Sequence, residues 1–182
     1  MIRSLFLIGI LGILLLGCKA QPKHTAVRMP DTESDTLMLV GTASLDSLAV
    51  APYSGWYHEN REAYAPSDEK IEALKPLLKK VKIQVFLGTW CKDSKREVPR
   101  FTKILEEAGY DPSRVEVIAV DREKIAPEEH VAGMSLINVP TFIFYKNKEE
   151  LGRIVEFPIE DLESDMLKIL SGEPYRHAYD WD

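Results

Sequence analysis

An alternation of β-rich and helical segments between residues 82 and 170 constrains the fold of this chain more than any other feature. The runs KIQVFLG at 82–88 and VEVIAVD at 115–121 have the length and composition of buried strands. The segment between them has apolar residues at the three- and four-residue steps of an amphipathic helix: Val98, Phe101, Ile104, Leu105 and Ala108. Two further strands, at 141–145 and 151–157, and a helix over 160–170 are expected next. The order β-α-β, then β-β-α, predicts an α/β fold with a central mixed β-sheet flanked by helices.

The residues before this unit have weaker patterns. LMLVG at 37–41 predicts a short strand, and the aromatic residues of 53–64 fall near one face if that segment is helical. Ser67 is expected to cap a helix whose apolar positions are Ile71, Leu74, Leu77 and Leu78. Residues 122–138 are expected to be irregular, with one helical turn around 127–131.

Residues 1–17 have the pattern of an export signal. Arg3 precedes an apolar run, Leu5 to Leu16, that is too short to span a bilayer as a helix. The letters LLGC at 15–18 resemble the lipobox of bacterial lipoproteins, and the resemblance implies cleavage before Cys18 and lipid on its sulfur. The alternative is a plain signal peptide with a chance cysteine near its end. We therefore expect a protein of the bacterial cell envelope that is lipid-anchored to a membrane and faces the periplasm.

This organisation predicts four parts. They are a lipoprotein signal peptide at 1–17, a lipidated N-terminus and polar tether at 18–36, an N-terminal extension at 37–66 that packs on the domain, and the domain itself at 67–182. The domain ends in a tail, EPYRHAYDWD, that mixes aromatic and acidic residues. We expect this tail to dock on the domain, and the alternative is a partner-binding segment.

Charge and residue spacing exclude several classes of function. The 23 basic residues are outnumbered by 29 acidic ones, and no basic cluster is interleaved with aromatic residues, so nucleic acid is not an expected partner. The histidines are scattered without ligand spacing, so we expect no metal and no other cofactor: His24, His58, His130 and His177. A cysteine–histidine hydrolase would need a histidine such as His130 beside Cys91, and nothing in the sequence fixes that geometry.

Once Cys18 carries lipid, Cys91 is the one cysteine left in the mature chain, and no disulfide can form within it.

Three motifs of the chain resemble the thioredoxin family. Trp90-Cys91 matches the segment before the redox loop, Pro99 matches the helix-kinking proline, and Val139-Pro140-Thr141 matches the cis-proline turn. The resemblance covers roughly residues 67–170 and implies a thioredoxin-like fold. It also implies that the cis-proline turn faces the nucleophile, with Trp90, Val139, Pro140 and Thr141 as substrate-binding residues around Cys91.

Several positions depart from the pattern of that family, among them Lys92-Asp93, which stand where the redox loop usually has Gly-Pro. Ser94 stands where the second cysteine of the redox loop is found, and Val85 replaces a buried acid. These two departures are consistent, because a chain without the second cysteine has no use for the acid that helps to deprotonate it. Lys148 replaces the hairpin glycine, and Glu156 replaces a later glycine beside the substrate groove.

A single sulfur limits the chemistry to the first half of disulfide exchange. Cys91 is expected at a helix N-terminus, where the helix dipole favours the thiolate, and the Ser94 hydroxyl is expected to donate a hydrogen bond to the sulfur. Such a thiolate can form a mixed disulfide with a substrate but cannot resolve it from within. We therefore expect a membrane-anchored monothiol protein with Cys91 and Ser94 as catalytic residues, whose partners are protein thiols or disulfides and an external thiol such as glutathione. The alternative is a non-catalytic thioredoxin-fold lipoprotein that acts as a binding or scaffold module.

Overall fold

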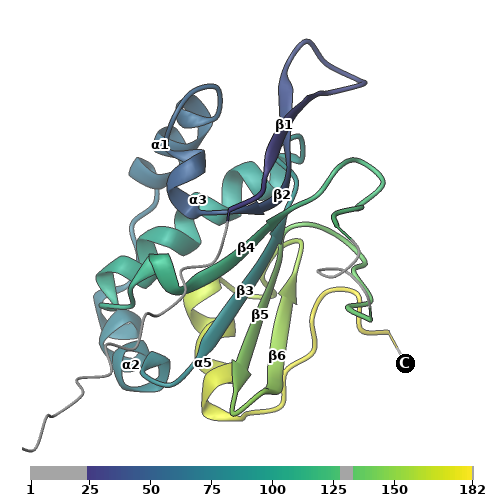
Figure 1. The fold of residues 1–182 in the computed structure, drawn as a ribbon. Coiled ribbons are helices and arrows are strands. Elements are labelled where there is room, and N and C mark those ends of the chain that lie inside the picture. The colour runs from purple at the N-terminus through teal and green to yellow at the C-terminus, as the bar shows by residue number, and fades with distance from the viewer. Residues whose placement is uncertain (1–23, 128–132, 182) are drawn as a thin grey trace, which may run out of the picture.

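The computed structural model describes residues 24–127 and 133–181, which form one β-sheet with helices packed on it (Figure 1). The strands are β1 (Val27–Pro30), β2 (Leu37–Ala43), β3 (Lys82–Leu87), β4 (Val115–Ala119), β5 (Thr141–Lys146) and β6 (Glu149–Val155). The helices are α1 (Ser54–Glu62), α2 (Asp68–Leu78), α3 (Lys92–Glu107) and α5 (Leu162–Ser171), with short 3-10 turns η1 (Leu45–Leu48) and η2 (Pro112–Arg114). The expected signal peptide, Cys18 and most of the turn expected at 127–131 lie outside the described residues.

The sheet is mixed and has the strand order β1-β2-β4-β3-β5-β6. Strands β3 and β4 run parallel and are joined by α3, whereas the other neighbouring pairs are antiparallel. This arrangement confirms the predicted α/β fold, and the helices and strands between residues 67 and 170 occur in the predicted order. The parallel pair also brings the carboxyl ends of β3 and β4 to the same edge of the sheet, where the loops that carry the site begin.

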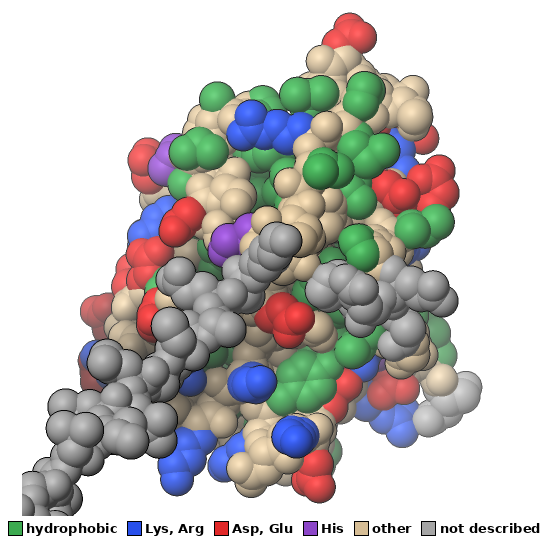
Figure 2. All heavy atoms as spheres, viewed as in Figure 1, with side chains coloured by type: hydrophobic (Ala, Val, Ile, Leu, Met, Phe, Trp, Pro, Cys, Tyr) green, Lys and Arg blue, Asp and Glu red, His purple; other side chains and the backbone are tan. Residues whose placement is uncertain are grey.

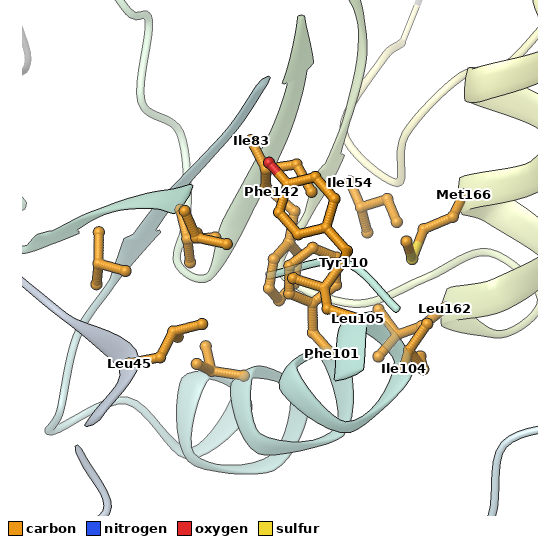
Figure 3. Close-up of a cluster of buried hydrophobic side chains, with 14 of the residues drawn as sticks. Leu45, Ile83, Phe101, Ile104, Leu105, Tyr110, Phe142, Ile154, Leu162 and Met166 are labelled. Carbon is orange, nitrogen blue, oxygen red and sulfur yellow. The ribbon is translucent and has the colours of Figure 1, made fainter. Parts of the chain in front are cut away.

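The two faces of the sheet are covered differently. On one face, Val85 and Leu87 of β3 join a large core with residues of all four helices, including Phe101 of α3, whose ring centroid lies 4.4 Å from that of Phe142 (Figure 3). On the other face, Phe86 of β3 belongs to a smaller cluster. The period of two along β3 explains this division, since successive side chains of a strand point to opposite faces.

The smaller cluster is closed by the irregular segment between β4 and β5 rather than by a described helix. Val120, Ala126 and Val139 are buried in it, and Trp90 and Cys91 pack against it. The candidate site therefore lies at the border between the sheet and this segment.

Helix α3 begins immediately after Cys91, which was expected at its N-terminus. Cys91 is its N-cap and has an extended backbone, with φ −76° and ψ 130°. Pro99 lies inside the helix and is buried, as the resemblance implied. Ser67 is likewise the N-cap of α2, although its side chain makes no capping hydrogen bond.

An ordered hairpin of β1 and β2 extends into the segment expected to be a tether. Strand β1 pairs with β2 from Val27 to Pro30, and all four of its residues are exposed. Because neither face of β1 is buried, its sequence lacks the alternation of apolar and polar residues by which a strand can be predicted. The tertiary contacts of the β1–β2 loop, described below, account for its order.

The surface carries charges of both signs, and Figure 2 shows acidic and basic side chains interspersed on one face. Within residues 24–127 and 133–181, no helix is long and apolar enough to cross a membrane.

Candidate functional site

Cys91 lies in the loop that connects the end of β3 to the start of α3. Its backbone N–H donates to the Gly88 carbonyl at 2.9 Å, and its own carbonyl accepts the first helical hydrogen bond, from Lys95 N–H at 3.0 Å. The thiol is partly exposed, and its S–H donates to the Val139 carbonyl at 3.1 Å. The sulfur therefore combines solvent access with a position at the positive end of a helix dipole.

The Val139–Pro140 peptide is cis, as the resemblance implied, and lies against Cys91. Both residues of this peptide are buried. Thr141 is buried as well, and its hydroxyl donates to the Asn138 carbonyl at 2.6 Å. The side chain of Thr141 thus holds the turn in place, while Val139 lines the pocket next to the sulfur.

Ser94 is fully buried in the first turn of α3. Its Oγ accepts a hydrogen bond from the Gly88 N–H at 3.1 Å. Among the described residues, no hydrogen bond joins the Ser94 hydroxyl to the Cys91 sulfur, although the sequence led us to expect one. Because a buried backbone N–H needs a partner, the contact with Gly88 gives Ser94 a role in holding the loop that carries Cys91.

Trp90 packs over the loop and forms one wall of the site. Its indole Nε1–H donates to the Val120 carbonyl at 3.0 Å, which ties the loop after β3 to the end of β4. A Cβ atom at Gly88 would lie 2.6 Å from the indole ring, closer than carbon atoms can approach. Glycine at position 88 is therefore required by the placement of Trp90.

Arg122 connects this tryptophan to the N-terminal hairpin. Its guanidinium carbon lies 5.2 Å from the centroid of the Trp90 ring, at the distance of a cation–π contact. It also binds the Asp31 carboxylate through two hydrogen bonds, of 2.6 Å and 2.9 Å, and contacts Glu33 at 2.7 Å. These hydrogen bonds from Arg122 hold the pKa of Asp31 well below its ordinary value.

A pocket of about 270 Å³ opens at Cys91. It is lined by Trp90, Cys91, Arg122, Lys124, Asn138, Val139 and Glu156. Of the residues predicted from the sequence, Trp90, Cys91 and Val139 meet in this pocket, whereas Ser94, Pro140 and Thr141 are buried and do not line it. Sequence reasoning missed Arg122, Lys124 and Asn138, although the first two come shortly after strand β4, which was predicted.

Glu156 was noted only as a replacement for glycine, and the structure gives it a place in the pocket. It follows the last residue of β6 and has a φ of 65°, in the left-handed region. Its N–H donates to the Pro140 carbonyl at 2.7 Å, so that its backbone is fixed against the cis-proline turn.

The described residues include no group of three or more histidine, cysteine, aspartate or glutamate side chains that could hold a metal ion. The site thus consists of a cysteine sulfur at the N-terminus of a helix that follows a central strand. A buried cis-proline turn lies next to this sulfur.

A family model described as Thioredoxin matches residues 52–166, which is more than half of the chain. The chain belongs to the thioredoxin family. The match begins before residue 67, so it includes the helix α1 that the motifs alone did not reach. A search of the curated proteins finds no match.

Solved structures of low sequence identity share the fold of this chain. A Pseudomonas aeruginosa protein of unknown function is 16% identical over 72% of this chain and 93% of its own, with a TM-score of 0.53. An HIV epitope scaffold is 15% identical over 73% of this chain and 94% of its own, with a TM-score of 0.55. Thioredoxin from Fasciola hepatica is 24% identical over 46% of this chain and 75% of its own, with a TM-score of 0.33.

Proposed function

We propose that this protein is a membrane-anchored monothiol member of the thioredoxin family that acts in thiol–disulfide exchange in the bacterial cell envelope. The observation that carries the proposal is the position of the Cys91 sulfur. It is partly exposed at the N-terminus of α3, and it lies 3.1 Å from the carbonyl of the residue before the cis-proline. The thiolate is the nucleophile of disulfide exchange, and the N-terminus of a helix is a position that suits an anion.

The proposed reaction begins with attack of the Cys91 thiolate on one sulfur of a substrate disulfide. A bond forms between Cys91 and that sulfur, and the other substrate sulfur leaves as a thiolate that takes up a proton. Ser94 cannot supply the second attack. Release therefore needs a second thiol of the substrate, which gives isomerisation, or an external thiol such as glutathione, which gives reduction.

Turnover of a scrambled or glutathionylated protein in the presence of free glutathione tests this reaction. We expect activity in the wild type and none in Cys91→Ser. Activity that survives the loss of Cys91 would contradict the proposal. Mixed disulfides captured on Cys91 in the native compartment, isolated under non-reducing conditions and identified by mass, would name the substrates.

We propose the membrane anchor from the sequence LLGC at 15–18, with Cys18 as the lipidated residue. Cys18→Ser is expected to move the protein from the membrane fraction to the soluble fraction. Cys91→Ser is the matched control, because it also removes one thiol but leaves the anchor and should stay with the membrane. Equal partition of the two variants would exclude Cys18 as the anchor.

A second candidate function is that of a binding or scaffold module without redox turnover. Its motivation is the joint absence of a second thiol at Ser94 and of an acid at Val85. In that case, partners would be captured without a covalent bond, and capture would persist in Cys91→Ser. Partners that are lost with the Cys91 thiol support exchange instead.

A further inference from the structure

Glu156 has a backbone conformation that glutamate rarely adopts. Its φ of 65° lies in the left-handed region, where a Cβ atom crowds the following carbonyl and glycine is the ordinary choice. Residues in such conformations cluster at functional sites, where the surrounding structure holds them. The chain therefore carries a side chain at a position where a glycine would be conformationally easier, and this side chain reaches into the pocket of Cys91.

Neighbouring residues orient the carboxylate of Glu156. Asn138 Nδ2 donates to its Oε2 at 3.3 Å, from the turn that also carries Val139. The Tyr179 hydroxyl of the C-terminal tail donates to the same oxygen, and the Tyr179 ring packs against Phe157 in an edge-on contact. Two donors from different segments thus fix one oxygen of Glu156.

The other residues that line the pocket offer no comparable proton acceptor. Arg122 and Lys124 are cations, Trp90 and Asn138 are neutral, and Val139 contributes an apolar side chain. Val85, six residues before Cys91, is apolar and fully buried. Asp93 is close to the site, but its carboxylate pairs with Arg96 at 2.7 Å. The carboxylate of Glu156 is the base that this pocket supplies.

The partly buried position of Glu156 favours such a role. Burial raises its pKa and the nearby Asp93 carboxylate adds to the shift, whereas the hydrogen bond from Asn138 and the charges of Lys124 and Arg96 oppose it. A carboxylate whose pKa is raised is a stronger proton acceptor, because its pKa comes closer to that of the group it must deprotonate.

We propose that Glu156 is the proton-transfer residue of the release step, in which a low-molecular-weight thiol attacks the mixed disulfide on Cys91. This inference rests on the proposed function. An external thiol with a pKa of about 8.5 is mostly protonated at neutral pH, and only its thiolate attacks. Glu156 accepts the proton of the thiol, whose sulfur then bonds to the substrate sulfur, and the bond from that sulfur to Cys91 breaks. The electron pair leaves with Cys91, and Glu156 returns the proton to the Cys91 sulfur.

Glutathione serves as the probe in the full chain. Cys91 is first loaded as its glutathione mixed disulfide, and free glutathione then releases it to give oxidised glutathione and the Cys91 thiol. The release rate is followed by acid quench and mass analysis between acidic and alkaline pH. We expect Glu156→Gln to slow release about tenfold near neutral pH, below the 10²–10⁴-fold typical of general acid–base catalysis because solvent also takes protons. This difference should vanish above the pKa of the thiol, where the proton is already lost.

Asp93→Asn is the matched control, since it removes a charge near Cys91 and leaves the base; it also takes away one cause of the raised Glu156 pKa, so we expect a loss that is smaller than that of Glu156→Gln. Glu156→Gly is the second variant, because glycine suits the left-handed backbone at this position, and we expect it to retain the fold. It should reproduce the pH-dependent loss of Glu156→Gln. A loss of equal size at all pH values, or an equal loss in Asp93→Asn, would overturn the role of Glu156. Wild-type protein that cannot be loaded at Cys91 would instead contradict the proposed function itself.

Discussion

The guanidinium of Arg122 lies over the indole ring of Trp90, 5.2 Å from its centroid, and at the same time holds the carboxylate of Asp31. One side chain thus connects the residue before Cys91 to the loop of the β1–β2 hairpin. A second connection runs from Leu39 N–H of β2 to the Thr89 hydroxyl, at 3.0 Å. The hairpin lies outside the region matched by the family model, and yet it contacts and stabilises the loop that carries Cys91.

Asp31→Asn is expected to weaken this connection. The amide cannot accept both hydrogen bonds of the guanidinium as an anion does, so Arg122 loses its fixed position over Trp90. We expect faster hydrogen exchange of the β1 and β2 amides and a changed fluorescence of Trp90. Glu33→Gln is the matched control, since Glu33 is largely exposed and makes one contact with Arg122, and its effect should be smaller.

The pH dependence of this contact follows from the sign of the shift. Because Arg122 lowers the pKa of Asp31, the contact stabilises the fold fully above the carboxyl's ordinary pKa of about 3.9 and is lost as the pH falls through the lowered folded value. Amide exchange in the hairpin, corrected for the intrinsic pH dependence of exchange, should therefore be constant between pH 8 and pH 5. Loosening of the hairpin within that range would contradict the assignment of Asp31 as its anchor.

Ser94→Ala is expected to lower the stability of the whole domain. The substitution leaves the Gly88 N–H buried without its acceptor, which costs about 1–3 kcal/mol of the free energy of unfolding. Urea denaturation measures this change. Ser171→Ala at the exposed end of α5 is the matched control and should stay within about 0.5 kcal/mol of the wild type. Equal stability of Ser94→Ala and the wild type would show that the serine does not hold the loop.

The fold could be predicted because its central elements repeat with clear periods. Strand β3 alternates between two buried faces, and α3 places a continuous apolar face on the sheet, so neighbouring residues alone determine these elements. Strand β1 has no buried side chains, and its order depends on Asp31 meeting an arginine that is 91 residues away in the chain. Hydrophobic periodicity cannot report such a contact.

The site was predictable to the extent that it follows sequence motifs. Trp90, Cys91 and Val139 meet as the family resemblance implies. The hydrogen bond that Ser94 accepts from the Gly88 N–H was not predicted, because the geometry of the loop decides which backbone groups reach the hydroxyl. Lys124 and Asn138 come from the irregular segment between β4 and β5. Such a segment has no repeating pattern from which the direction of a side chain could be predicted.

The hairpin between β5 and β6 offers a stabilising substitution. Asn147 and Lys148 have φ values of 55° and 73°, which are the left-handed values of a tight turn that favours Asn-Gly. Lys148→Gly removes the crowding of a Cβ atom at the second position, and we expect a gain of about 0.5–1 kcal/mol after the entropic cost of glycine. Thermal and urea unfolding measure it. Lys146→Gly, in the preceding strand, is the matched control and should lose about 0.5–1 kcal/mol.

Ser94→Cys tests why the chain carries a single sulfur. In the first turn of α3, position 94 follows Cys91 by three residues, a spacing that brings side chains to the same face of a helix. We expect the new thiol to attack mixed disulfides on Cys91 and to close an internal disulfide, so that covalent adducts decrease and the oxidised chain accumulates. Adducts are compared on non-reducing gels, and the internal disulfide is detected by mass. Ser94→Ala supplies the control, because it removes the hydroxyl without adding a thiol and should retain the adducts. If Ser94→Cys keeps as many adducts as the wild type, the lifetime of the mixed disulfide is not limited by a missing second thiol, and the binding function would become the better account.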